Sequence, residues 1–182
     1  MTRNLRITFA AALMLGVAPL ANAKNPMVGG AAMFPAKNII ENAVNSKDHT
    51  TLVAAVKAAD LVETLSGAGP FTVFAPTNAA FAKLPAGTVD TLLKPENKGQ
   101  LSTILTYHVV PGRITAAQIA ANAKAHHGTA TYATVQGGSL SFRKAGNGWT
   151  ITDQKGDVGH ITIADVMQSN GVIHVIDTVM LP

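Results

Sequence analysis

The feature that most constrains the fold of this chain is a change in hydrophobic periodicity near its middle. In the first half, apolar residues recur at the three- and four-residue spacing of amphipathic helices, as at Leu52, Val53 and Val56. From Thr129 onward, apolar and polar residues alternate, which is typical of strands with one buried face. A chain with helices first and antiparallel strands later is expected to form an α+β domain with the two kinds of element in separate layers.

Turn-forming residues divide both halves into short elements. Gly67-Ala68-Gly69-Pro70 ends a helical stretch and precedes a strand expected at residues 71–75. A later helical stripe over residues 101–108 is expected to end at Pro111-Gly112. In the second half, turns at Gly137-Gly138 and Gly146-Asn147-Gly148 predict hairpins between strands near residues 129–135, 140–143 and 149–152, followed by strands near 161–163 and 172–181.

Residues 1–23 predict export. A basic start with two arginines is followed by an uncharged, mostly apolar run over residues 7–20 and by the small-x-small site Ala21-Asn22-Ala23, as in a secretory signal peptide. A membrane anchor is the alternative, but this run is shorter than the roughly 20 apolar residues that a span needs and contains a glycine and a proline. We therefore expect cleavage, a periplasmic, secreted or cell-surface location, and no stable membrane insertion afterwards.

The rest of the chain has the size of one domain. Residues 24–36 contain glycine and proline without periodicity and are expected to form a flexible leader, although Met27, Met33 and Phe34 could dock on the domain instead. Residues 37–182 are expected to form a single, monomeric domain. The sequence has no cysteine, so a domain of this length is expected to rely on its hydrophobic core and not on disulfides.

Charge and ligand patterns exclude several function classes. Cleavage after residue 23 would remove two of the 14 basic residues and lower the net charge from +4 to +2. There is no basic stripe or nucleic-acid-binding motif, so nucleic acid is not an expected partner. His126 and His127 are adjacent and lack the spacing of metal ligands, so we expect a surface loop there and no metal or other cofactor.

Three sequence motifs follow one another along the domain. They are Phe-Thr-Val-Phe-Ala-Pro-Thr-Asn-Ala-Ala-Phe at residues 71–81, Tyr107-His108-Val109-Val110, and a long apolar segment at residues 170–182. In this order they resemble the hallmark motifs of the fasciclin (FAS1) domain family, with a resemblance from about residue 38 to the last residue. The resemblance implies a small exported bacterial-type member: a β-wedge or sandwich with helices packed along one edge, acting in adhesion or matrix association.

The last motif predicts a strand that is buried on both faces. Residues 172–176 place apolar side chains on both sides of an extended chain, as in strands that lie between two layers. The preceding Asn170-Gly171 pair predicts a tight entry to this strand, with Gly171 at positive φ.

Tyr107 and His108 are the first candidate partner-binding residues. In animal members of the resembled family, the Tyr-His segment is associated with integrin binding, which implies a partner contact here. The alternative interpretation is structural. His108 ends a helical apolar stripe and is then expected to be buried, with ring nitrogens that bond to the backbone and hold helix to sheet.

Asp165, Val166 and Met167 are the second candidate group. Animal adhesion members of the resembled family carry an Asp-Ile-Met or Asp-Ile-Leu integrin motif at the matching place, just before the last long motif. The resemblance implies that Asp165 supplies a metal-dependent carboxylate contact to a receptor. The alternative is a capping or turn aspartate whose oxygens accept hydrogen bonds from nearby backbone N–H groups.

The expected function is binding and not catalysis. Ser139, Ser141 and Ser169 are potential nucleophiles, but there is no Gly-x-Ser-x-Gly motif, and His174 and Asp177 would lie on opposite faces of their strand. The expected partners are extracellular or surface proteins or glycans. The alternative function is binding of a hydrophobic small ligand such as a carotenoid, as in some algal fasciclin-type proteins, and an apolar pocket would favour it.

Overall fold

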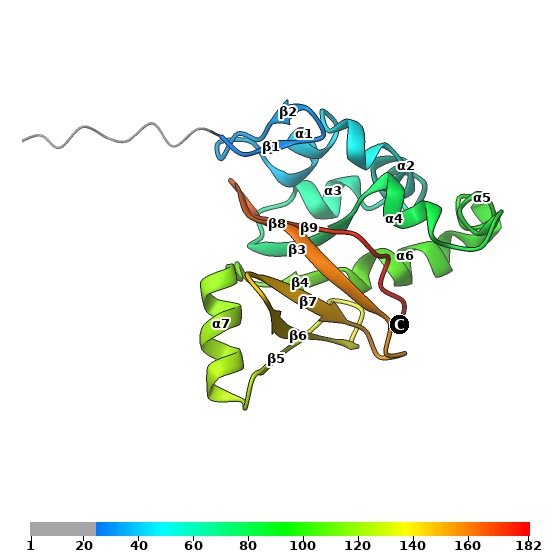
Figure 1. Ribbon diagram of the computed structural model, residues 1–182. Coiled ribbons are helices and arrows are strands. Elements are labelled where there is room, and N and C mark those ends of the chain that lie inside the picture. Colours follow the sequence, from blue (N-terminus) through cyan, green and yellow to red (C-terminus); the bar gives the residue numbers. More distant parts are fainter. Residues whose placement is uncertain (1–24) are drawn as a thin grey trace, which may run out of the picture.

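The computed structural model of the protein describes residues 25–182 and is built on a seven-stranded mixed sheet (Figure 1). Its strand order is β4-β3-β9-β8-β7-β6-β5; β3 and β9 run parallel, and the other neighbours run antiparallel. The strands are β3 (Phe71–Pro76), β4 (Val109–Pro111), β5 (Thr129–Ala133), β6 (Ser139–Ala145), β7 (Gly148–Thr152), β8 (Val158–Gln168) and β9 (Gly171–Ile176). The predicted signal peptide lies outside the described residues.

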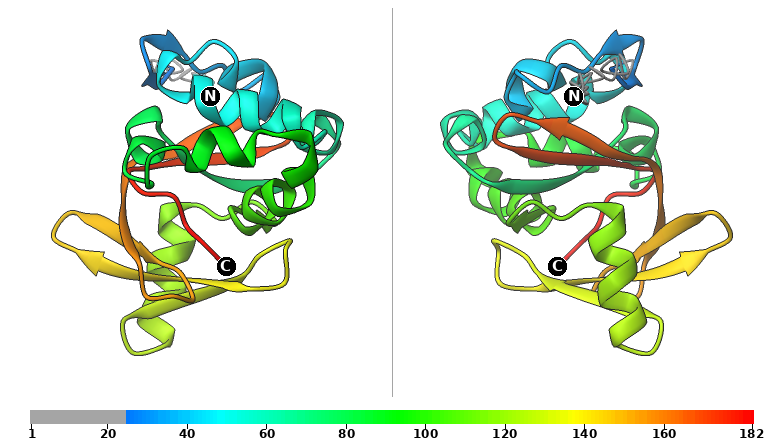
Figure 2. Two further views of the ribbon diagram at one scale, coloured as in Figure 1. Left: turned by 90° about the vertical axis from the view of Figure 1, so that its right-hand side faces the viewer. Right: turned by 90° about the vertical axis from the view of Figure 1, so that its left-hand side faces the viewer.

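The helices of the first half gather on one side of the sheet, and α7 lies apart from them, against β5 and β6 (Figures 1 and 2). The helices are α1 (Ile39–Ala43), α2 (Thr50–Ala58), α3 (Val62–Ser66), α4 (Asn78–Ala82), α5 (Thr88–Leu92), α6 (Lys98–Tyr107) and α7 (Ala116–Ala125), with 3₁₀ turns η1 (Lys47–His49) and η2 (Pro95–Asn97). The expected α+β fold, with strands in a wedge and helices packed beside them, is confirmed.

The sheet curls until its two edges almost meet. The Val135 N–H, just after edge strand β5, donates a hydrogen bond of 2.8 Å to the carbonyl of Val109 in edge strand β4. The seven strands therefore form a wedge that is close to a barrel.

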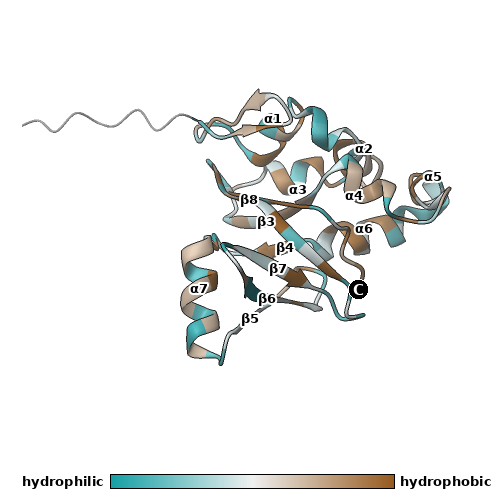
Figure 3. Cartoon of the chain, in the orientation of Figure 1, coloured by the Kyte–Doolittle hydropathy of each residue, from teal (hydrophilic) through white to brown (hydrophobic). Residues whose placement is uncertain are grey.

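Two hydrophobic cores lie on opposite sides of β3 and β9. Hydrophobic positions recur along the strands and helices that surround them (Figure 3). On β9, Ile173 and Val175 belong to the core under the helices, whereas Ile176 belongs to the core inside the curled strands. On β3, Val73 and Phe74 divide in the same way. All of β9 is buried, so the prediction of a last strand covered on both faces is confirmed.

Two local predictions are wrong. The helical stripe ends at Tyr107, and Val109–Pro111 forms β4, because β-branched residues followed by proline favour the extended backbone that pairs with β3. Gly171 does not adopt positive φ. A glycine is required there because a Cβ would overlap the carbonyl of Phe71 on the parallel neighbour β3.

The segment expected to be a flexible leader instead folds against the domain from residue 25 onward. It forms a hairpin of β1 (Met27–Val28) and β2 (Ala31–Ala32). Val28 and Met33 are buried in the core under the helices, whereas Met27 and Phe34 are 58% and 44% exposed. Val28 and Met33 lie on either side of a turn formed by two positive-φ glycines. Their spacing matches neither the helical nor the strand periodicity, so the sequence pattern could not predict their burial.

Asn170 joins several elements at the entry to β9. Its side-chain nitrogen donates hydrogen bonds of 2.8 and 2.9 Å to the carbonyls of Leu65 and Gly67, and its Oδ1 accepts one of 3.0 Å from the Ile39 N–H. Its backbone carbonyl accepts a bond of 3.0 Å from the Phe71 N–H. Since Asn170 is buried, one amide side chain pairs backbone groups that water reaches poorly.

Replacing Asn170 with alanine is expected to lower the free energy of unfolding by about 2–4 kcal/mol. The reason is that backbone groups of Leu65, Gly67 and Ile39 lose their partner, and an unpaired buried group costs about 1–3 kcal/mol before water restores part of it. Denaturant unfolding measures the change. Asn147→Ala, in an exposed turn, is the matched control and should stay within about 0.5 kcal/mol of the parent protein. Equal stability of the two variants would contradict this role of Asn170.

Candidate functional site

His108 is a buried link between α6 and the end of the chain. Its Nδ1–H donates a hydrogen bond of 2.8 Å to the Ile104 carbonyl, and its Nε2 accepts one of 2.9 Å from the Met180 N–H. The side chain is 2% exposed, and burial lowers its pKa from 6.5 to about 4. The ring is therefore neutral at physiological pH, with its proton placed on Nδ1 by these two partners.

Tyr107 connects α6 to the start of β6 and to the turn after β7. Its hydroxyl donates a hydrogen bond of 2.7 Å to the Ser139 carbonyl and accepts one of 3.0 Å from the Gln154 N–H. The residue has no exposed surface, and burial raises the pKa of its hydroxyl. Both side chains of the Tyr-His motif thus serve internal contacts, and neither reaches a surface where a partner could touch it.

Asp165 lies on an exposed irregularity of β8, where the register with β9 shifts on both sides of Ile163. Its backbone has φ of 58°, and its N–H donates a hydrogen bond of 3.3 Å to Nδ1 of the buried His174. Its Oδ1 accepts one of 2.8 Å from the Ala116 N–H at the start of α7. Within the described part of the chain, Oδ2 has no hydrogen-bond partner. Asp165 therefore caps a helix and keeps one carboxylate oxygen available at the surface.

His174 holds this irregularity from inside the sheet. Its Nε2–H donates a hydrogen bond of 2.8 Å to the Ile114 carbonyl, and its ring stacks on Phe74 with centroids 5.4 Å apart. Burial lowers its pKa, so the ring is neutral and Nδ1 can accept the Asp165 N–H. The sequence alone could not show that a buried histidine positions Asp165.

The other two residues of the second candidate group are less accessible. Val166 is fully buried in the core under the helices, and Met167 is partly buried. Asp165 is the exposed member, and its neighbours differ from those of Tyr107 and His108. The Tyr107–His108 pair and the Asp165–Met167 segment therefore do not form a single site.

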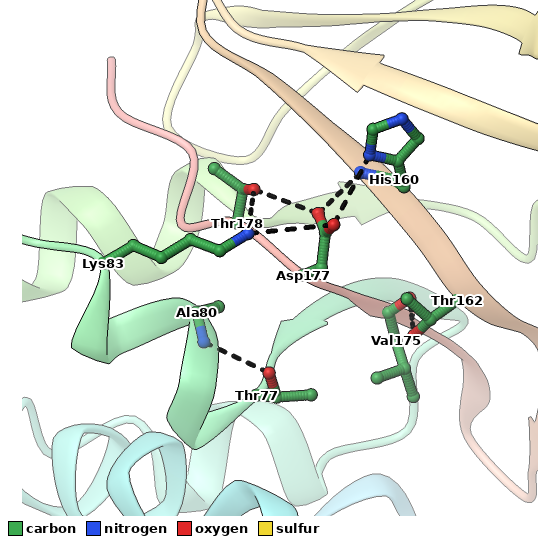
Figure 4. A network of polar contacts seen from close by, with 8 residues as sticks. All are labelled: Thr77, Ala80, Lys83, His160, Thr162, Val175, Asp177 and Thr178. Atoms are coloured by element: carbon green, nitrogen blue, oxygen red, sulfur yellow. Dashed lines mark hydrogen bonds and ion pairs between the residues drawn. The ribbon is translucent and has the colours of Figure 1, made fainter.

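A polar network at the end of β9 joins three elements (Figure 4). The Asp177 Oδ1 accepts hydrogen bonds from the His160 N–H at 2.8 Å and from the Thr178 hydroxyl at 3.0 Å, while Oδ2 lies 3.4 Å from the His160 Nδ1 and 3.8 Å from the Lys83 Nζ. Partial burial opposes ionisation of Asp177, but these hydrogen bonds and charges outweigh it and lower the pKa of the carboxyl. The network fastens α4 and β8 to the end of β9, and Asp177 is not paired with His174.

An apolar cavity of about 50 Å³ lies between the N-terminal hairpin, the first helices and the sheet, and its few polar lining residues include Ser46 and His49. Ser46 Oγ and His49 Nδ1 are 2.9 Å apart, and both residues are 3% exposed. In the described chain, the His49 Nε2 completes no hydrogen bond, although the nearby Ala75 carbonyl opposes the lowering of the His49 pKa that burial causes. The sequence analysis missed this pair, because only the packing of η1 against the sheet reveals it.

The arrangement of potential catalytic groups does not build a triad in the described chain. Ser46 and His49 form a Ser–His pair, but both are buried and no carboxylate orients the second ring nitrogen. The ring nitrogens of His108 and His174 are occupied by backbone groups. Among residues 25–182, no cluster of three or more acidic or histidine side chains is arranged to hold a metal ion. No helix in that range is long and apolar enough to cross a bilayer.

Comparison with known sequences decides the family. The sequence model of the Fasciclin domain matches residues 47–182. This chain belongs to the fasciclin domain family. Protein sll1483 of Synechocystis sp. is 53% identical to this fasciclin domain protein over 161 residues, which cover 87% of this chain and 81% of that protein.

Two relatives from Mycobacterium bovis carry descriptive names. The immunogenic protein MPB70 is 35% identical over 191 residues, which cover 94% of this chain and 90% of that protein. The cell surface glycolipoprotein MPB83 is 35% identical over 166 residues, which cover 88% of this chain and 68% of that protein.

A solved structure shares the fold. It is a FAS1 domain pair from the insect cell adhesion molecule Fasciclin I, with a TM-score of 0.70 and 19% identity, and the match covers 80% of this chain and 51% of the pair. The fasciclin domain described here therefore spans about half the length of that pair. The family resemblance and the wedge fold predicted from the three motifs are confirmed.

Acid is expected to destabilise this fasciclin domain through His108. Between about pH 6.5 and pH 4, the unfolded chain binds a proton on His108 that the folded protein does not, because burial lowers the folded pKa to about 4. The contribution of this group to stability is therefore complete above about pH 6.5 and falls as the pH drops, by on the order of 3 kcal/mol in all. Urea unfolding across this range measures the slope.

Two variants isolate the contribution of His108. His108→Gln is expected to flatten the loss of stability between about pH 6.5 and pH 4, since it removes the titrating ring. His126→Gln alters an exposed histidine and should keep the full slope. Equally steep slopes for both variants would show that His108 does not carry the effect. His49 and His174, whose pKa values burial also lowers, account for the slope that remains.

Proposed function

We propose that this protein is an exported surface module of the adhesion type, which binds other proteins or glycans and does not catalyse a reaction. The observation that carries the proposal is the internal use of its motif side chains. Tyr107 and His108 are buried and bonded to backbone groups, so the motifs build a scaffold and recognition falls to the exterior. Membership of the fasciclin family and the names of the relatives, a cell surface glycolipoprotein and a cell adhesion molecule, support this function.

Asp165 is the proposed contact point on that exterior. It is exposed, its position is fixed by the His174 and Ala116 contacts, and one carboxylate oxygen is not used by the described chain. A carboxylate held in this way binds a partner donor, or a metal ion bridged to the partner, with little loss of conformational entropy. Met167 lies two residues further along β8 and offers a partly exposed apolar neighbour.

Export is part of the same proposal. The basic start, apolar run and Ala21-Asn22-Ala23 site support removal of residues 1–23 and a periplasmic, secreted or cell-surface location. A monomer is also part of this proposal, and the burial of most of the large apolar side chains supports it.

Asp165→Asn is expected to weaken capture of surface proteins or glycans by at least about 10-fold, because a charge-assisted hydrogen bond is worth about 1.5–3 kcal/mol. Asparagine keeps an oxygen for the Ala116 N–H and tolerates positive φ, so the fold should be unchanged. Capture from cell-surface extracts, quantified for the parent protein and each variant, is the measurement. Asp90→Asn, an exposed aspartate on α5, is the matched control.

The outcomes separate the contact from the function. If Asp165→Asn and Asp90→Asn capture the same material equally, Asp165 is not the contact, and the binding function stands. If the parent protein captures no surface protein or glycan, the adhesion-type function is contradicted.

Binding of a hydrophobic small ligand is a second candidate function, and the apolar cavity beside His49 favours it. The cavity of about 50 Å³ is far smaller than a carotenoid, so such a ligand would have to displace the hairpin that contributes Val28 and Met33 to the lining. Native mass spectrometry of the purified protein is expected to detect the co-purifying ligand. Ala43→Leu narrows the cavity and should abolish binding, whereas Ala58→Leu, on an exposed face of α2, should not. A parent protein without any added mass would contradict this candidate.

A further inference from the structure

A second hollow lies at the other end of the molecule, between α7 and strands β7 and β8, and belongs to none of the sites described above. It is an open cleft of about 640 Å³, within the range of small-molecule sites. Its walls come from one face of α7, from the turn between β6 and β7, and from β8, which lie beside one another in Figures 1 and 2. The lining residues are Ala116, Ala120, Ala123, Lys124, Gly128, Lys144, Asn147, Gly148, Trp149, Ile161, Thr162 and Ala164.

The cleft exists because the side chains between the helix and the sheet are too small to fill the space. Ile119 is fully buried and anchors α7 to the core inside the curled strands. The neighbouring face of α7 offers three alanines, and Trp149 and Ile161 form an apolar floor opposite them. The cleft is open to solvent, and its small alanine side chains leave room beside the floor for the apolar part of a ligand.

The charges around the cleft are all of one sign. Lys124 and Lys144 line it, and no aspartate or glutamate of the described chain does. The Lys144 Nζ lies over the Trp149 ring, 5.4 Å from its centroid, and donates a hydrogen bond of 3.3 Å to the Asn147 carbonyl. This ammonium group is therefore held at the edge of the apolar floor instead of extending freely into solvent.

The other polar groups near Lys124 and Lys144 do not cancel the attraction of these two lysines for an anion. Two of the last four carbonyls of α7, which would repel it, already accept hydrogen bonds: Ala123 from the Gly128 N–H at 2.7 Å and Asn122 from the His126 N–H at 3.1 Å. The Asp165 carboxylate is at the opposite end of the helix, bonded to the Ala116 N–H. From Ala116 to Lys124 the helix extends about 12 Å, which separates the negative end from the positive end.

We propose that this cleft binds a small amphipathic anion, with an apolar body between the α7 alanines and Trp149 and with its acidic group at Lys124 and Lys144. The apolar floor accounts for the body of the ligand, and the two lysines account for its charge. Trp149 and Ile161 are 8% and 9% exposed, so they close the floor of the cleft, and exposed lining residues such as Ala120 and Ala164 offer accessible apolar surface above it. The cleft adjoins the proposed adhesion contact at Asp165 through Ala116 and Ala164, but the assignment of an anion rests on the lysine end and not on Asp165.

Titration calorimetry of the full-length protein with decanoate, below its micelle concentration, tests the proposal. Decanoate should bind at one site, and decyltrimethylammonium, which has the same chain length and the opposite charge, should not. Lys144→Gln is expected to weaken decanoate binding by about 10-fold through loss of a charged hydrogen bond. Ala120→Leu places a larger side chain in the cleft and should abolish binding. Both positions are exposed, so the fold should tolerate these changes.

Matched variants give the outcomes that decide it. Ala121→Leu on the exposed side of α7 and Lys94→Gln, outside the cleft lining, should bind decanoate as the parent protein does. Binding that survives Ala120→Leu would place the ligand elsewhere, for example in the cavity beside His49, and would overturn the proposal. Equal binding of decanoate and the cationic analogue would overturn the assignment of an anion, and no binding of decanoate would overturn the site.

Discussion

The burial of β9 on both faces is the constraint on which the rest of the domain depends. A strand between two hydrophobic cores offers its polar side chains almost no water, so each of them needs a partner within the protein. Asn170 meets this need at the entry by bonding to α1 and to the end of α3, and His174 does so in the middle by bonding to Ile114 and to the irregularity in β8. Asp177 joins α4 and β8 where the strand reaches the surface. The polar residues of the last motif therefore join β9 to several different helices and strands.

Two of the internal connections work only with uncharged histidines. His108 and His174 each use one ring nitrogen as a donor to a carbonyl and the other as an acceptor from an N–H. A protonated ring has two donors and would face an N–H with one of them. The same contacts that fix the scaffold thus remove both rings from the set of groups that could bind a partner or act as a base at the surface.

The sequence predicted the parts of the fold that depend on local pattern. The alternation after Thr129 and the glycine turns located the hairpins, and the apolar run before the last residues located β9. The parallel pairing of β9 with β3, the packing of Val28 and Met33, and the reason for Gly171 depend on residues far apart in the chain, which a local pattern does not record.

The candidate sites also divide into features that a local sequence pattern predicts and features that depend on residues far apart in the chain. The burial of His108 followed from its helical stripe, and its bonding to backbone groups agrees with the structural interpretation. The role of Asp165 required knowledge of the register shift in β8 and of the ring behind it. The Ser46–His49 pair and the cleft beside α7 arise from packing between elements, so no spacing in the sequence could indicate them.

The near-closure of the sheet has a consequence for how copies of this protein behave when they are concentrated. A strand at an open rim carries unpaired N–H and C=O groups that can recruit the same rim of another molecule and begin a fibre. Here the rim strands turn toward each other, joined where the Val135 N–H meets the Val109 carbonyl, and one of them, β4, has only three residues. A chain with no disulfides and a small net charge thereby resists amyloid-like stacking through its topology.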